Sequence, residues 1–278
     1  MHLRNILLAF SVLMIGFCLT LYFQSESPIQ STMSFDQYLL ENTGTKSFSL
    51  EEFNQKITPL RLEAIIAEVY SKNKLAGERT RVMQVGIRNG RSLMELKRLF
   101  PEVEFYGVAK EKTHEFYRRE SFMLTALKFN LFTKPELEEM VLPYVIFQDL
   151  DFGQRIPYDE NKFDVIYSQD AIPNIRYTFE LLNEIMRVLK KGGISIHSDF
   201  TGVNVFSSGV VIDLKEVMKE FRKKGIDAYV LDNPLSIRFK KPDYNALFPV
   251  TPHQPIPANL ENLSIEQRRP EMGYNLNP

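Results

Sequence analysis

The chain has 278 residues, of which 44% are hydrophobic and 25% charged, with 34 basic and 35 acidic side chains. This composition is ordinary for a globular protein, so collagen-like, low-complexity and wholly disordered classes are excluded. A formal charge of −1 provides no overall basic surface, and we expect no nucleic-acid partner. Cys18 is the only cysteine and the four histidines are scattered, so we expect neither a disulfide framework nor a metal site.

An uncharged apolar stretch over 6–23 follows a short N-terminus, 1–5. A helix of that length spans roughly 27 Å, close to the thickness of a hydrocarbon core. We interpret 6–23 as a transmembrane signal anchor, and a removed signal peptide, which normally has a shorter apolar region, is the alternative. Arg4 before the stretch, with Glu26 and Asp36 after it, favours a cytoplasmic N-terminus. The prediction is a single-pass membrane protein whose domain is lumenal or extracellular.

The rest of the chain divides into three parts by composition. A polar stalk over 24–48 precedes a domain over 49–241, and a proline-rich tail occupies 242–278. Within the domain, short β-rich runs alternate with helical patterns, which predicts a mostly parallel sheet covered on both faces. The expected helices lie at 49–56, 60–72, 91–99, 112–128, 136–142, 178–190 and 211–224. The expected strands lie at 81–87, 103–108, 144–148, 163–168, 193–198, 226–231 and 235–240, the last two as an antiparallel pair. The fold class is therefore α/β, in three layers with seven strands.

A glycine turn follows the first expected strand. Gly86 allows a sharp exit from the strand, and Gly90 allows the next helix to begin close to that strand or to a ligand. The helix N-terminus has unpaired N–H groups and a partial positive charge, to which Arg88 and Arg91 would add. This arrangement suits a carboxylate or a phosphate, although many α/β proteins need such a turn merely to fold.

A second region carries a more specific pattern. The chain reads IPYDENKFDVI over 156–166 and RVLKKGG over 187–193, with a helical stretch between them and a strand after them. In order and spacing, the segment over about 80–200 resembles the class I S-adenosylmethionine-dependent methyltransferases, particularly the methyltransferase type 11 group. The resemblance implies a Rossmann-like fold, S-adenosylmethionine as cofactor, and a small-molecule, lipid or protein methyl acceptor.

The resemblance also implies which positions contact the cofactor. The loop after the first strand, with Gly86, Arg88 and Gly90, would hold the methionine part. Gln84 stands where the family usually has an acidic residue. The ribose-binding acidic position falls on Ala109, followed by Lys110. The cofactor-binding set that we expect is Gln84, Gly86, Arg88, Gly90, Ala109, Lys110, Asp149, Leu150 and Ser168, of which Asp149 and Leu150 would lie near the adenine.

Candidate catalytic groups lie at the carboxyl ends of the fourth and fifth strands, where open α/β sheets bind ligands. Asp170 or His197 could act as the general base for a hydroxyl, amine or carboxyl acceptor. Asp170 could equally cap the following turn, and His197 could be a satisfied sheet residue. We interpret Asp164, at the start of its strand, as structural.

Two other functions are alternatives at the level of the sequence, and the sequence argues against the second. Gln84 and Ala109 replace two cofactor-facing carboxylates, which is also what a catalytically inactive binding or scaffold domain would show. A nicotinamide dehydrogenase would have G-x-G-x-x-G and an acid at the end of the second strand, and this chain has neither.

Overall fold

The computed structural model describes residues 48–108, 115–146, 156–169, 171, 178–198, 203–205, 210–212, 214–231, 236–244 and 246–247. The predicted anchor, almost all of the stalk and most of the tail lie outside these residues. In the described part, no helix is both long enough and apolar enough to cross a membrane. The segment over 6–23 lies outside the described residues, so the anchor stays a prediction.

Seven strands form one sheet in the order β3-β2-β1-β4-β5-β9-β8. All neighbours from β3 to β5 are parallel, β9 runs antiparallel to β5, and β8 runs antiparallel to β9. The strands are β1 (Arg81–Val85), β2 (Glu104–Val108), β3 (Val145–Ile146), β4 (Phe163–Gln169), β5 (Leu189–Ser198), β8 (Asp227–Leu231) and β9 (Ser236–Lys240). The predicted seven-stranded, mostly parallel sheet is confirmed.

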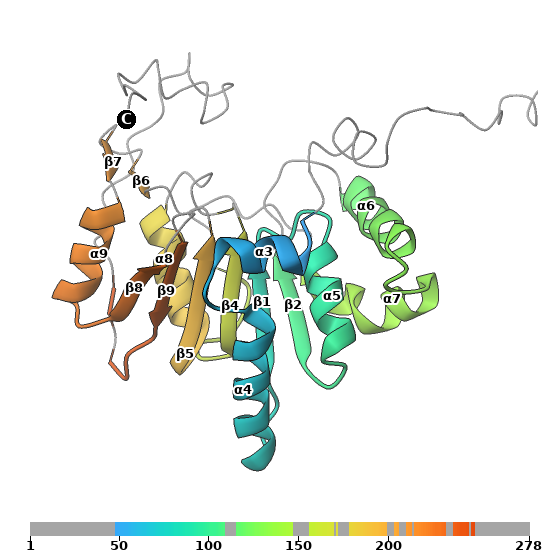
Figure 1. Ribbon diagram of the computed structural model, residues 1–278, viewed down its shortest axis with the longest axis horizontal. Coiled ribbons are helices and arrows are strands. Elements are labelled where there is room, and N and C mark those ends of the chain that lie inside the picture. Colours follow the sequence, from blue (N-terminus) through green and yellow to red (C-terminus); the bar gives the residue numbers. More distant parts are fainter. Residues whose placement is uncertain are drawn as a thin grey trace, which may run out of the picture.

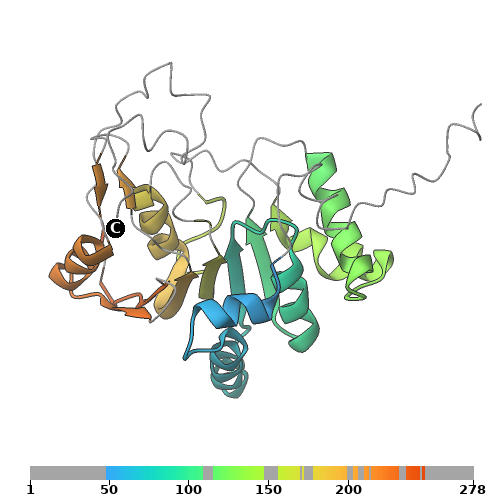
Figure 2. The same ribbon diagram turned by 45° about the horizontal axis from the view of Figure 1, so that its top comes forward.

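Helices cover both faces of this sheet, as the continuous burial of β4 requires. In Figures 1 and 2, α3 and α4 lie on one face and α8 lies on the other. Two hydrophobic clusters correspond to these faces, one containing residues of α3, α4 and α5 and the other residues of α8 and α9. The helices are α3 (Leu50–Lys56), α4 (Leu62–Leu75), α5 (Arg91–Leu99), α6 (Glu115–Lys128), α7 (Lys134–Met140), α8 (Thr178–Val188) and α9 (Leu214–Lys223), with the short 3-10 helix η1 (Leu142–Tyr144).

The sequence prediction missed one pair of strands. A small antiparallel pair, β6 (Val203–Val205) and β7 (Val210–Ile212), occupies a region for which we predicted no strand. The expected helix over 211–224 consequently begins only at Leu214. The β-branched residues of β7 favour an extended backbone. Because they directly precede an amphipathic segment, the sequence pattern assigns them to the first turn of its helix.

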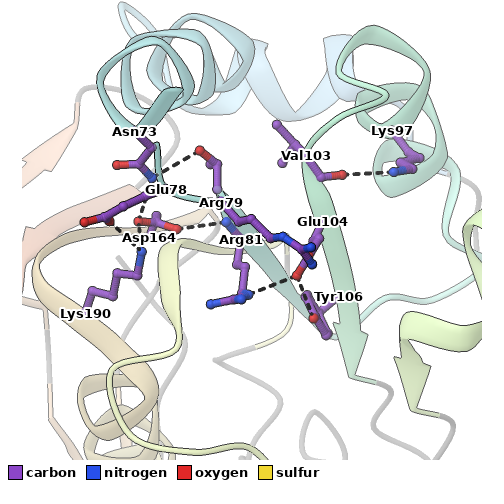
Figure 3. Close-up of polar contacts among 11 residues, drawn as sticks. Asn73, Glu78, Arg79, Arg81, Lys97, Val103, Glu104, Tyr106, Asp164 and Lys190 are labelled. Carbon is purple, nitrogen blue, oxygen red and sulfur yellow. Dashed lines mark hydrogen bonds and ion pairs between the residues drawn. The ribbon is translucent and has the colours of Figure 1, made fainter. Parts of the chain in front are cut away.

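Polar residues at the amino ends of the strands are hydrogen-bonded to one another (Figure 3). The buried carboxylate of Asp164 accepts hydrogen bonds from Asn73 Nδ2 at 2.9 Å, the backbone N–H of Arg81 at 2.8 Å and Lys190 Nζ at 2.7 Å. It thereby connects α4, β1 and β5 to β4. The structural role predicted for Asp164 is confirmed.

The carboxyl ends of β1 and β4 mark the point where the strand order reverses. From β1 the chain continues to β2 on one side, whereas from β4 it continues to β5 on the other. In open α/β sheets, ligands bind in the crevice at such a reversal. The fold therefore places the predicted glycine turn, which follows β1, at the expected position for a ligand.

Candidate functional site at the ends of β1 and β4

The turn between β1 and α5 has three residues with left-handed backbone. The φ angles are +75° at Gly86, +48° at Arg88 and +73° at Gly90. Glycine adopts this conformation without a steric penalty, but a residue with a side chain does so only at some cost. The turn is attached to the end of β2, because the N–H of Gly86 donates to the carbonyl of Val108 at 2.8 Å. Arg88 is thus held in an unfavourable conformation by its surroundings.

Both glycines are tightly packed. A Cβ atom on Gly86 would lie 2.5 Å from the Cβ of Ala171, just after β4, and one on Gly90 would lie 1.9–2.5 Å from ring atoms of Phe122 in α6. The first approach shows that Gly86, just after β1, and Ala171, just after β4, lie against each other. The second shows that Gly90 makes room for an aromatic side chain of the same protein.

The two arginines of the turn have different surroundings. Arg91 is paired with Glu95, at 2.9 Å, and its guanidinium lies 3.7 Å from the ring centroid of Phe129. Arg88 is half-buried, and its guanidinium lies 4.4 Å from the ring centroid of Phe48, just before α3. Arg91 is therefore held by a residue of its own helix and by Phe129, just after α6, whereas Arg88 connects the turn to the segment that begins α3.

Gln84 lies inside the domain, in contact with β4 and α5. Its Oε1 accepts hydrogen bonds from the hydroxyl of Tyr167 at 2.9 Å and from Ser92 Oγ at 3.4 Å. Burial raises the pKa of Tyr167, so its hydroxyl keeps the proton that it donates. The residue at the family's acidic position thus stabilises the contact between β1 and β4, and its predicted role towards the cofactor stays a prediction.

Ser168 and His197 lie next to each other on β4 and β5. His197 is completely buried, with Nδ1 2.7 Å from Ser168 Oγ and Nε2 2.7 Å from Ser195 Oγ. Burial lowers the pKa of His197 to about 3. A general base works best with a pKa near the operating pH and within reach of the substrate. This geometry favours the alternative role of a satisfied sheet residue for His197.

The buried imidazole should make stability depend on pH. The unfolded chain takes up a proton near pH 6.5, whereas folded His197 stays neutral down to about pH 3. The contribution of neutral His197 to the free energy of unfolding is therefore complete above pH 6.5 and is lost as the pH falls below that value. Between about pH 7.5 and pH 5.5, urea unfolding should show that the wild type loses about 1.4 kcal/mol more than His197→Asn. Equal losses in both proteins would show that the imidazole is accessible to protons.

Five predicted site residues, Ala109, Lys110, Asp149, Leu150 and Asp170, lie outside the described residues. The strands that precede them end at Val108, Ile146 and Gln169. These strands are parallel members of one sheet, so their carboxyl ends share one edge. The assignments of these five residues stay predictions.

Within the described residues, four buried side-chain atoms have no hydrogen-bond partner, and they belong to three residues. They are Nδ2 of Asn89, Oγ of Ser121, and both Nε2 and Oε1 of Gln169. Asn89 precedes Gly90, Ser121 precedes the Phe122 that packs on Gly90, and Gln169 ends β4. Buried polar groups are normally paired, and unpaired ones cost free energy. S-adenosylmethionine and a polar methyl acceptor both have hydrogen-bonding groups, and two such ligands bound side by side fit this part of the molecule.

None of these three residues is among the site residues that the sequence predicts. The sequence contains little that would indicate buried, unpaired side chains at these positions. Polar residues at the ends of apolar runs, such as Gln169, are common in loops, and only the three-dimensional arrangement shows that these side chains are buried.

Comparison with known proteins adds family information. Residues 123–197 match the family model described as a methyltransferase domain. This match confirms the resemblance to class I S-adenosylmethionine-dependent methyltransferases, and it supports S-adenosylmethionine as the cofactor. No curated protein matches the chain.

The solved structures to which the chain is similar share little sequence with it. The [4+2]-cyclase SpnF is 20% identical, with 62% of this chain and 60% of that chain covered and a TM-score of 0.38. The DszA carbon methyltransferase is 12% identical, with 77% of this chain and 59% of that chain covered and a TM-score of 0.49. A SAM-dependent methyltransferase from Aquifex aeolicus is 17% identical, with 70% of this chain and 98% of that chain covered and a TM-score of 0.39. The chain thus spans about three fifths of the length of the first two.

Proposed function

We propose that the protein is an S-adenosylmethionine-dependent methyltransferase whose cofactor and methyl acceptor meet at the ends of β1 and β4. The observation that carries this proposal is the left-handed turn over Gly86–Gly90 at the point where the strand order reverses. The match of residues 123–197 to a methyltransferase domain supports the same function. The acceptor is a small molecule, a lipid or a protein side chain.

The residues of the turn have the chemistry to hold the amino-acid part of this cofactor. Arg88 provides a cation for a carboxylate, and the buried Nδ2 of Asn89 provides a hydrogen-bond donor without a partner among the described residues. Bound S-adenosylmethionine supplies a methyl group on a sulfonium, and the electrons of the broken S–CH3 bond stay on sulfur when the acceptor takes the methyl. The protein then has to align the acceptor and, for an O–H or N–H acceptor, receive its proton. Asp170 remains our candidate for the general base that receives this proton.

Calorimetry tests the cofactor assignment directly. The full chain, purified in mild detergent, should bind S-adenosylhomocysteine with a Kd of roughly 1–100 µM, corresponding to about −8 to −5.5 kcal/mol. NAD is the control ligand, and we expect no heat from it because the turn lacks the dinucleotide-binding pattern. Absence of heat with millimolar S-adenosylhomocysteine would contradict the proposal, and binding of NAD instead would favour a dehydrogenase.

A catalytically inactive binding or scaffold domain is the second candidate. It is favoured by Gln84, whose amide oxygen is engaged by Tyr167 and Ser92 at the position of a family carboxylate. Binding of S-adenosylhomocysteine is compatible with both candidates. Transfer of a labelled methyl group from S-adenosylmethionine to any component of a cell extract distinguishes them, because only the enzyme consumes the cofactor.

We further propose that residues 6–23 anchor the protein in a membrane, with the domain on the lumenal or extracellular side. The support is the uncharged apolar stretch itself and the position of Arg4 before it. In this arrangement the methyl acceptor would be reached from the membrane surface or from the compartment that the domain faces.

A further inference from the structure

The side chain of Gln169 is buried without any hydrogen bond. It is 1% exposed, and neither Oε1 nor Nε2 has a partner among the residues that the structure describes. Such an amide has lost its hydrogen bonds to water without replacement, which destabilises the fold. Gln84 offers a contrast in the same sheet, because it is also buried and its Oε1 accepts two hydrogen bonds. The unsatisfied amide of Gln169 therefore calls for an explanation beyond packing.

Gln169 lies next to the turn that we assign to the cofactor. It is the last residue of β4, and its neighbour Ser168 pairs with Val85, the residue before Gly86. Ala171, two residues further on, lies against Gly86, where an added Cβ would be 2.5 Å from its own Cβ. The orphaned amide is thus at the reversal of strand order, where open α/β sheets bind ligands.

Strand alternation gives the face of the sheet on which Gln169 lies. Side chains two residues apart share a face, so Gln169 is on the same face as Tyr167. Tyr167 contacts Phe53 of α3, with ring centroids 5.4 Å apart, and donates to Gln84. The amide of Gln169 therefore lies on the α3 face, one step nearer the carboxyl edge than this satisfied pair.

The adenine of the cofactor is expected elsewhere. The segment that we predict to contact it follows β3, which is three strands from β4 in the sheet. At about 4.8 Å per strand, the ends of β3 and β4 are roughly 14 Å apart. Gln169 is therefore too far from this segment to pair with the adenine. The amino-acid part of the cofactor is assigned to Arg88 and Asn89, which leaves the methyl acceptor as the partner of Gln169.

We propose that Gln169 is a positioning residue that holds the methyl acceptor by paired hydrogen bonds. An amide offers one acceptor oxygen and an NH2 donor, so both are satisfied by a neutral group with a donor and an acceptor side by side. Carboxamides and amino-substituted heterocycles have this pattern. A carboxylate would satisfy Nε2 and leave Oε1 facing a negative charge, and an ammonium group would satisfy only Oε1. This inference rests on the proposed methyltransferase function and narrows its substrate class.

Thermal unfolding without ligand tests whether the amide is truly unpaired. Gln169→Leu should raise the melting temperature by about 3 °C, because it removes a buried polar group and no hydrogen bond. Gln84→Leu, the matched control, should lower it, because Tyr167 loses its acceptor. A lower melting temperature for Gln169→Leu would overturn the inference by showing that the amide has partners within the protein.

Ligand-observed saturation-transfer NMR tests the acceptor class. With the full chain saturated by S-adenosylhomocysteine, benzamide should give a signal that Gln169→Leu abolishes, and benzoate and benzylamine should give weaker signals. A benzamide signal that persists in the variant, or charged probes that bind as strongly, would overturn the inference.

Calorimetry separates the inference from the function on which it rests. Gln169→Leu should bind S-adenosylhomocysteine as tightly as the wild type. A loss of at least tenfold in the variant alone would place Gln169 in the cofactor site and overturn its role towards the acceptor. Failure of the wild type to bind S-adenosylhomocysteine would instead contradict the proposed function, and the unfolding experiment would still report on the amide.

Discussion

Gly90→Ala should lower the free energy of unfolding by about 3 kcal/mol. A left-handed backbone costs a residue with a Cβ atom roughly 1–2 kcal/mol, and overpacking costs about 1–3 kcal/mol more. Both terms apply, because Gly90 has a φ of +73° and an added Cβ would lie 1.9 Å from Cζ of Phe122. Urea unfolding of the two proteins measures the difference.

Gly77 provides the matched control. Its φ is +71°, and an added Cβ would have no atom within 4 Å. Gly77→Ala therefore has the same cost of a left-handed backbone as Gly90→Ala and the same effect on the unfolded chain, but its added Cβ has no steric clash. Replacing Phe122 with Leu in the Gly90→Ala background should restore part of the stability, because the ring is then absent. Equal effects at Gly77 and Gly90 would show that Phe122 can move away without cost.

Arg88→Ala should weaken the binding of S-adenosylhomocysteine by about 10- to 100-fold. A hydrogen bond between charged groups contributes roughly 1.5–3 kcal/mol, and removing Arg88 leaves the ligand carboxylate without its cation. Binding of 5′-methylthioadenosine, which lacks the amino-acid part, should not change. Calorimetry with both ligands measures the two affinities.

Arg91→Ala is the control for general electrostatic effects, because Arg91 begins α5 directly after the same turn and is engaged by Glu95 and Phe129. We expect a much smaller change in affinity from it. Arg88→Gly should bind S-adenosylhomocysteine as weakly as Arg88→Ala while relieving the strained φ of +48°. If Arg88→Ala weakened both ligands equally, Arg88 would act through the shape of the turn.

The framework of the domain was predictable because its patterns are local. The helix at 91–99 was predicted with the observed bounds, and the alternation of strands and helices led to the observed mostly parallel sheet. The start of β5 was predicted four residues late, at 193 instead of Leu189. The first pairing, between Phe163 and Leu189, is followed by a shift of register, so the strand begins in a run of basic and glycine residues without a β pattern.

The site was less predictable, because its properties depend on which strands are neighbours. The hydrogen bond between Tyr167 and Gln84 joins residues 83 positions apart and exists only because β1 and β4 pair in that register. His197 resembles a catalytic base in the sequence, and its complete burial between Ser168 and Ser195 follows from the pairing of β4 with β5. The orphaned amide of Gln169 likewise became visible only when the structure showed its neighbours.

The network around Asp164 in Figure 3 separates the cohesion of the domain from its chemistry. At that end of the strands, a buried carboxylate accepts hydrogen bonds from three different elements, so α4, β1 and β5 are joined to β4 at the end of the sheet opposite the candidate site. The carboxyl ends of the strands therefore contribute less to holding these elements together. Turns there can acquire new side chains, and with them new substrates, while the scaffold that carries them endures.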